Sequence, residues 1–170
     1  ILFLSLVFSF TIPVNNNELL IELRNEKNWS LVEIRSDSIN VYEKSIQGLN
    51  LRALKVEKIV SFNAKSVLDI VMDIDNYPEI MDNADVQSFI VGQKNNEVYA
   101  YNYFPIPIPF IDDRHYFFKI KRMNERELNW SLISMSEVKA SSKLKSIINK
   151  NPDAVYLNSG AGYWLSLIHI

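Results

Sequence analysis

The 170-residue chain contains no cysteine, so disulfide bonds, thiolate nucleophiles and thiolate metal sites are all excluded. Histidine is scarce as well: the chain has two, His115 and His169, and no HExxH-type spacing. A zinc site would need carboxylates to complete it, and we expect neither a metal nor another cofactor. Glycine and proline number only 4 and 6, which is typical of neither a fibrous repeat nor a disordered segment.

An excess of charge of one sign is also absent. The 18 basic residues are balanced by 20 acidic ones, the net charge is −2, and both kinds are scattered along the chain. A nucleic-acid-binding protein would carry a basic stripe, so we expect no nucleic-acid partner. With 48% hydrophobic residues, a chain of this length can bury the core of one ordinary domain without disulfide bonds or metal ions to stabilise it.

The first ten residues, ILFLSLVFSF, are apolar apart from two serines, and the apolar character fades by Val14. A bilayer span takes roughly 20 residues, so this run has the length of a signal-peptide hydrophobic region. We therefore interpret residues 1–14 as a signal-peptide-like segment whose start is missing, and expect a periplasmic or secreted protein. The alternative is a buried strand or an N-terminal helix. At the other end, LSLIHI resembles read-through of a sequencing adapter, which would leave His169 without a role.

The spacing of apolar residues predicts the elements between the ends. Helices are expected over 18–31, over 64–72 with Asn63 as cap, and in a short segment whose first turn holds Pro78. Strands are expected over 38–44, 51–62, 86–92, 97–104, 114–122, 127–136, 155–157 and 162–167. Pro105, Pro107 and Pro109 predict an extended loop, and 137–153 predicts a loop with one weak helical turn. This order indicates an α+β fold with antiparallel strands.

Several short motifs appear in a set order: Trp29, then INVY at 39–42, DIDNYP at 73–78, PIP at 107–109 and DRHYF at 113–117. Together they resemble a START (StAR-related lipid-transfer) domain of bacterial type, in the helix-grip or Bet v 1-like superfamily. The resemblance covers roughly 18–168, and His115 stands where that family carries an acid. It implies a curved antiparallel sheet with two short helices between early strands and a long C-terminal helix that closes a hydrophobic tunnel. That helix would follow Trp164, so we expect a domain that is incomplete at its C-terminus.

Alternation places Tyr99, Tyr101 and Tyr103 on one face of their strand. We expect the same face to carry Phe118, Ile120, Trp130 and Leu132, which together would make an apolar pocket with a few hydroxyls. A register error of one residue would invert this assignment, and simple core packing is the alternative. Some START domains carry an arginine where Ile120 stands, so the resemblance implies a neutral or weakly polar ligand here.

Arg114 is expected to meet Asp112, Asp113 or a ligand head group, or to tie down its loop. The acidic residues Asp73, Asp75, Asp82 and Asp85 lack the pattern of a calcium loop and are read as helix caps and solvated loop.

The function we expect is non-catalytic binding and transfer of a lipid or other hydrophobic small molecule by a monomer, with transient membrane contact. One alternative is an enzyme on the same scaffold, of the aromatase/cyclase or hydrolase kind, using His115 or tyrosines as acid–base groups. A protein-interaction module with an aromatic surface is the other.

Overall fold

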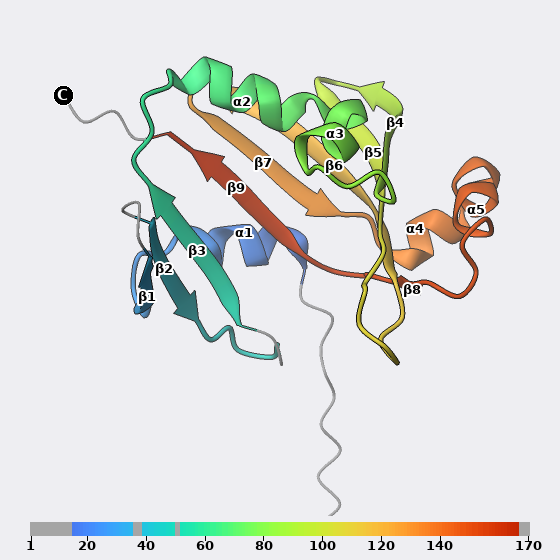
Figure 1. The fold of residues 1–170 in the computed structure, drawn as a ribbon, viewed down its shortest axis with the longest axis horizontal. Helices are drawn as coiled ribbons and strands as arrows, with labels where there is room; N and C mark the ends of the chain where they lie inside the picture. Colours follow the sequence, from blue (N-terminus) through green and yellow to red (C-terminus); the bar gives the residue numbers. More distant parts are fainter. Residues whose placement is uncertain (1–14, 36–38, 50–51, 167–170) are drawn as a thin grey trace, which may run out of the picture. The chain divides into compact units, whose positions relative to one another are not determined.

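The computed structural model describes residues 15–35, 39–49 and 52–166. The signal-peptide-like segment expected over 1–14 and His169 lie outside these residues. By its contacts the chain divides into two compact units, Ile1–Ile59 and Val60–Ile170, where the sequence predicted one domain over 18–168. Figure 1 labels the helices and strands of both units.

Among its described residues, the first unit contains one helix and a three-stranded antiparallel sheet. Its elements are α1 (Asn16–Arg24), β1 (Ser30–Arg35), β2 (Ile39–Lys44) and β3 (Ala53–Lys58), in the sheet order β1-β2-β3. The strands predicted over 38–44 and 51–62 correspond to β2 and to a shorter β3, and they pair antiparallel with Val41 opposite Val56. The predicted first helix is shorter than expected, because the backbone of Asn25 turns extended and Asn28 adopts a left-handed φ of 67° before β1 begins.

A buried lysine ties α1 to β2. The Lys44 side chain is only 1% exposed, and its ammonium lies 2.7 Å from a Glu22 carboxylate oxygen. The same ammonium donates to the backbone oxygens of Glu22, at 2.8 Å, and Asn25, at 3.0 Å. These oxygens belong to the C-terminal end of α1, where Glu22 O also accepts from the Asn25 N–H and Asn25 O from the Trp29 indole N–H. Lys44 therefore donates hydrogen bonds to carbonyls at the end of α1, and these bonds with the Glu22 ion pair offset the cost of burying its charge.

The second unit is built on a largely antiparallel sheet. Its strands are β4 (Gln87–Lys94), β5 (Glu97–Phe104), β6 (Arg114–Asn124), β7 (Glu127–Leu132), β8 (Val155–Tyr156) and β9 (Ala161–Leu165). The order is β4-β5-β6-β7-β9, and β8 pairs in parallel with β6. Asn95 and Asn96 join β4 to β5 with φ values of 50° and 61°, the conformation that two-residue hairpin turns require. The proline-rich segment connects β5 to β6 as a loop, as predicted.

Short helices complete the second unit. They are α2 (Ala64–Met72), the 3-10 helix η1 (Ile74–Asn76), α3 (Tyr77–Ile80), α4 (Met135–Lys139) and α5 (Ser142–Ile148). The bounds and cap of α2 are as predicted, because the Asn63 side chain accepts from the backbone N–H of Ser66. Pro78 lies in the first turn of α3, also as predicted. The two helices α4 and α5 replace the single weak turn expected over 137–153.

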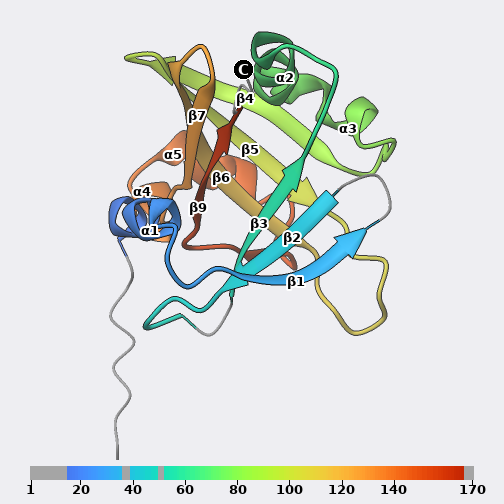
Figure 2. The same cartoon turned by 90° about the vertical axis from the view of Figure 1, so that its left-hand side faces the viewer.

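Both faces of this sheet are buried. Residues directly opposite each other on neighbouring strands share a face. Ala100 lies opposite Phe118, in a cluster that packs with α2, η1 and α3, whereas Tyr101 lies opposite Phe117, in a cluster that packs with α4 and α5. The two groups of helices lie on opposite sides of the sheet (Figure 2). We call these sides the α2 face and the α5 face.

The chain is thus an α+β protein with antiparallel sheets and short helices, as expected. Across the described ranges, no helix combines the length and apolar character needed to cross a membrane.

Candidate functional site

The residues predicted to line one pocket divide between the two faces. Those on the α5 face are Tyr99, Tyr101 and Tyr103. Those on the α2 face are Phe118, Ile120, Trp130 and Leu132. The prediction of one shared surface is wrong, because the pairing of β5 with β6 sets Tyr101 opposite Phe117 and not Phe118. An offset of one residue moves every side chain of a strand to the other face.

The four residues on the α2 face form a continuous apolar surface. Phe118 lies opposite Leu132 and Ile120 opposite Trp130, so the four side chains fill two adjacent rows of β6 and β7. On β9, Gly162 lies opposite Trp130, and the indole ring covers it so closely that an added Cβ would meet the ring at 2.6 Å. Trp130 is only partly buried, so the apolar surface reaches solvent at this margin.

A row of three neutral polar side chains crosses the same face. Ser88 on β4 lies opposite Asn102 on β5, which lies opposite Tyr116 on β6. Ser88 Oγ donates to Asn102 Oδ1 over 2.6 Å, and Asn102 Nδ2 donates to Tyr116 Oη over 3.3 Å. Ser88 and Asn102 are 8% and 3% exposed, a burial that is costly for unpaired polar groups. The sequence did not predict this row: Asn102 is visible as a polar residue between Tyr101 and Tyr103, but its partners lie on two other strands.

Tyr116 stands where the polar row meets aromatic side chains. Its ring stacks with that of Phe104 at 6.0 Å between centroids and meets Phe118 edge-on at 5.9 Å. Burial raises the pKa of the Tyr116 hydroxyl. Tyr77, on α3, donates to the Val71 carbonyl over 2.5 Å, and burial raises its pKa to about 12. Both phenols are therefore neutral hydrogen-bond donors at physiological pH.

Arg114 binds the loop that precedes it. Alternation along β6 places its side chain on the α2 face with Tyr116. Its Nη1 donates to the backbone oxygens of Asp112, at 2.5 Å, and Asp113, at 3.2 Å. These contacts fit the loop-tying role foreseen for Arg114, although they reach backbone oxygens and not the carboxylates.

The Asp113 carboxylate fixes the base of the loop formed by residues 105–113. It accepts hydrogen bonds from the Tyr103 hydroxyl and, at 2.8 Å, from the backbone N–H of Ile106. These two bonds lower the pKa of Asp113, and the bond to Asp113 raises the pKa of Tyr103 to about 12. Tyr103 therefore acts as a loop anchor on the α5 face.

The tip of this loop presents apolar side chains to solvent. Phe110 is 104% exposed, and Ile108 and Ile111 are 54% and 43% exposed. Phe110 also has a φ of 68°, a left-handed conformation that bulky residues seldom adopt. Exposed apolar side chains gathered in one place mark interaction sites more often than isolated ones do.

On the α5 face, His115 belongs to a buried polar network. It is 3% exposed, its Nδ1 lies 3.0 Å from the Tyr101 hydroxyl, and its ring meets that of Tyr156 edge-on at 5.4 Å. The Asn151 amide donates to the Tyr101 hydroxyl over 3.1 Å. Burial lowers the pKa of His115, so its imidazole is neutral at pH 7. Because the Tyr101 oxygen already accepts from Asn151, its own proton is available to Nδ1, an arrangement that puts the ring proton on Nε2.

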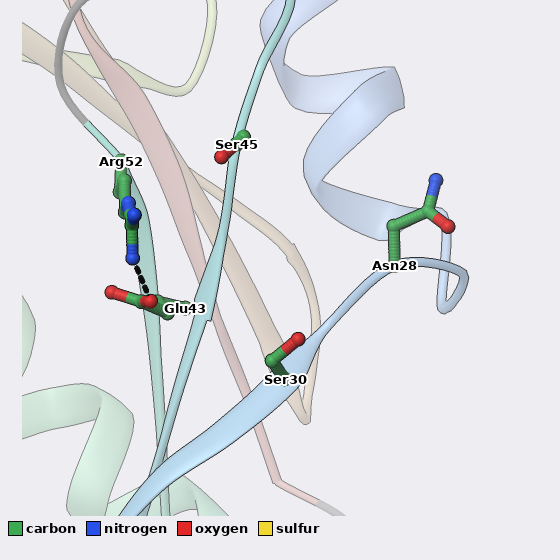
Figure 3. A pocket seen from close by; sticks show the side chains of 5 residues that line it. All are labelled: Asn28, Ser30, Glu43, Ser45 and Arg52. Carbon is green, nitrogen blue, oxygen red and sulfur yellow. Dashed lines mark hydrogen bonds and ion pairs between the residues drawn. The ribbon is translucent and has the colours of Figure 1, made fainter.

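The first unit carries a polar hollow of about 440 Å³. Its lining residues are Asn28, Ser30, Glu43, Ser45 and Arg52. Arg52 forms an ion pair with Glu43 on one side of the hollow, and Asn28 stands on the other (Figure 3). The paired charges cancel and the lining is mostly polar, so the hollow does not suit an apolar ligand.

In the part of the chain that the structure describes, no three histidine, aspartate or glutamate side chains are placed to hold a metal ion.

No protein-family model, curated protein or solved structure matches this chain. The α2 face, with its apolar surface and its polar row, is therefore the candidate site.

Proposed function

We propose that the α2 face binds a lipid or another hydrophobic small molecule and carries it without chemical change. The observation that carries this proposal is the composition of the face. Phe118, Ile120, Trp130 and Leu132 supply the apolar surface, and the row from Ser88 to Tyr116 supplies a few fixed polar groups. Sites for small hydrophobic ligands have this composition.

The order of residues along β6 orients the ligand. Tyr116 is close to the 105–113 loop, and Phe118 and Ile120 follow it away from that loop. A head group would lie beside Tyr116, and a hydrocarbon tail would lie along the apolar rows, where each buried methylene contributes about 0.8 kcal/mol. The ligand would enter at the Trp130 margin, where this indole is only partly buried.

The same proposal includes the helix-grip fold and membership of the START-type family. It is supported by the order of elements along the chain, in which α2, η1 and α3 follow β3 and precede the antiparallel strands of the second unit. In that fold a long helix covers the ligand, so exchange would require movement of that helix or of the 105–113 loop.

The loop tip is the element we assign to membrane contact during transfer. Phe110, Ile108 and Ile111 expose apolar surface, and the loop base is fixed by Asp113. A tip of this kind can enter the boundary between head groups and acyl chains, as other exposed apolar side chains do.

Ligand binding is tested with the neutral fluorophore N-phenyl-1-naphthylamine, whose emission rises in apolar sites. The wild-type chain should bind it saturably, and Trp130→Leu should weaken binding several-fold by removing part of the α2 face. Tyr99→Leu is the matched control, because Tyr99 is also a partly buried aromatic residue but lies on the α5 face. Equal losses in both variants, or no binding by the wild type, would refute the proposal.

A further inference from the structure

The distances in the polar row fix the direction of its hydrogen bonds. The 2.6 Å separation of Ser88 Oγ and Asn102 Oδ1 lies within the range of O–H···O bonds and below that of N–H···O bonds. The 3.3 Å separation of Asn102 Nδ2 and Tyr116 Oη is well beyond the usual range of O–H···O bonds and only just beyond that of N–H···O bonds, so Nδ2 is the donor of a weak bond. The Asn102 amide therefore points its oxygen at Ser88 and its nitrogen at Tyr116.

This direction leaves the Tyr116 proton free. Tyr116 Oη accepts from Asn102, so its own O–H points elsewhere, and within the described residues it donates to no protein acceptor. The neighbouring rings of Phe104 and Phe118 present no strong acceptor. A hydroxyl donor in apolar surroundings gains the full value of a hydrogen bond when an acceptor arrives.

We infer that Tyr116 donates this hydrogen bond to a neutral oxygen of the ligand, such as the carbonyl of an ester or ketone; the inference rests on the proposed function of the α2 face. Ser88 and Asn102 are positioning residues, because they hold Tyr116 as a donor and occupy its oxygen. The face thereby selects for acceptor-bearing lipids over plain hydrocarbons of the same length.

The charges on this face favour a neutral acceptor over a carboxylate. A carboxylate buried here would need a cation as partner. Two arginines of β6 share the face by alternation, and both are engaged. Arg114 binds the loop carbonyls, and Arg122 pairs with Asp69 on α2 at 2.5 Å. The acceptor that Tyr116 meets is therefore uncharged.

The test compares two ligands that differ in one carbonyl. 2-Dodecanone and dodecane are each titrated against the full chain loaded with N-phenyl-1-naphthylamine, and the midpoint of displacement is measured. One neutral hydrogen bond predicts that the ketone displaces the fluorophore at a concentration about three- to tenfold lower than dodecane does. Tyr116→Phe should bring the ketone and dodecane midpoints together. Both midpoints are measured in the same variant, so a change in its fluorophore affinity affects the two ligands alike.

Ser88→Ala gives a second test that leaves Tyr116 in place. Without the Ser88 hydroxyl, the Asn102 amide is free to turn over and accept the Tyr116 proton, so the ketone preference should fall here too. A residue with a merely structural role would weaken both ligands equally. Tyr101→Phe, on the α5 face, is the control that should keep the preference, and circular dichroism confirms that each variant is folded.

Different results would overturn the inference about Tyr116 and the proposed binding of ligands by the α2 face. If fluorophore and dodecane bind but the ketone has no advantage, or keeps its advantage in Tyr116→Phe or Ser88→Ala, the inference about Tyr116 is overturned and the proposed function stands. If the fluorophore does not bind the wild type, the proposed function falls, and the inference falls with it.

Discussion

Replacing Gly162 with alanine tests the packing of the candidate site through a single methyl group. The added Cβ would lie 2.6–2.7 Å from three atoms of the Trp130 indole, whereas carbon atoms in contact sit about 3.5–4.0 Å apart. The ring must therefore move by about 1 Å or the two strands must separate. Overpacking of this kind costs about 1–3 kcal/mol of unfolding free energy.

An opposing effect reduces the net change. Alanine restricts the unfolded chain more than glycine does, which stabilises a protein by about 0.4–1 kcal/mol where the native backbone suits alanine. Gly92→Ala on β4 measures this effect alone, because a Cβ there meets nothing within 4 Å. The difference in unfolding free energy between the two variants isolates the clash, and we expect Gly162→Ala to be less stable by about 1–3 kcal/mol.

The assay is urea unfolding followed by far-ultraviolet circular dichroism, with equal m-values as the check that the folded states match. Repeating Gly162→Ala in a Trp130→Leu background completes a double-mutant cycle, in which the smaller side chain should remove the penalty. The reasoning is refuted if Gly162→Ala is as stable as Gly92→Ala, or if the penalty persists without the indole.

Three further predictions concern other parts of the chain. Because burial lowers the pKa of His115 from its ordinary value of 6.5, the unfolded state takes up a proton first, so stability should fall as pH drops below about 6.5; the urea midpoint of His115→Gln should depend less on pH across this range. Phe110→Asn should raise the urea midpoint slightly, because asparagine tolerates a left-handed backbone, while reducing co-sedimentation with zwitterionic lipid vesicles; vesicle binding equal to wild type would count against the loop as the membrane contact. Lys44→Met should lower the unfolding free energy by about 1–3 kcal/mol, since two carbonyls at the end of α1 each lose one of their donors and Glu22 loses its ion pair. Lys58→Met on exposed β3 should cost far less in the same measurement.

Local chemistry made several elements predictable from the sequence. Asn63 and the apolar stripe behind it gave α2 its bounds, and the Asn95–Asn96 pair marked the β4–β5 turn. By contrast, β1 was missed: the predicted first helix ran to Leu31 and overlapped the start of this strand, and no element was predicted over the rest of it. A signal for α4 was present but overlooked: Ser134 and Glu137 form a capping box.

The candidate site was less predictable, for a reason of geometry. Alternation within β5 and within β6 is legible, and each set of side chains was assigned to one face correctly. Which set faces which helices depends on the pairing of the two strands, and the long 105–113 loop leaves that pairing open until Phe104 is seen opposite Arg114. Asn102 was not predicted as a site residue, because its role depends on Ser88 and Tyr116, which the strand pairing places on either side of it.

The two-sided burial of the β4–β7 sheet also bears on how the protein can diversify. Along β5, positions 98, 100 and 102 belong to the α2 face, whereas 99, 101 and 103 belong to the α5 face. Consecutive positions of β5 therefore pack in different clusters, and a substitution at one position changes only the face to which that position belongs. If the α2 face binds the ligand as proposed, substitutions at 98, 100 and 102 would change ligand preference, while 99, 101 and 103 would keep the packing around the His115 network.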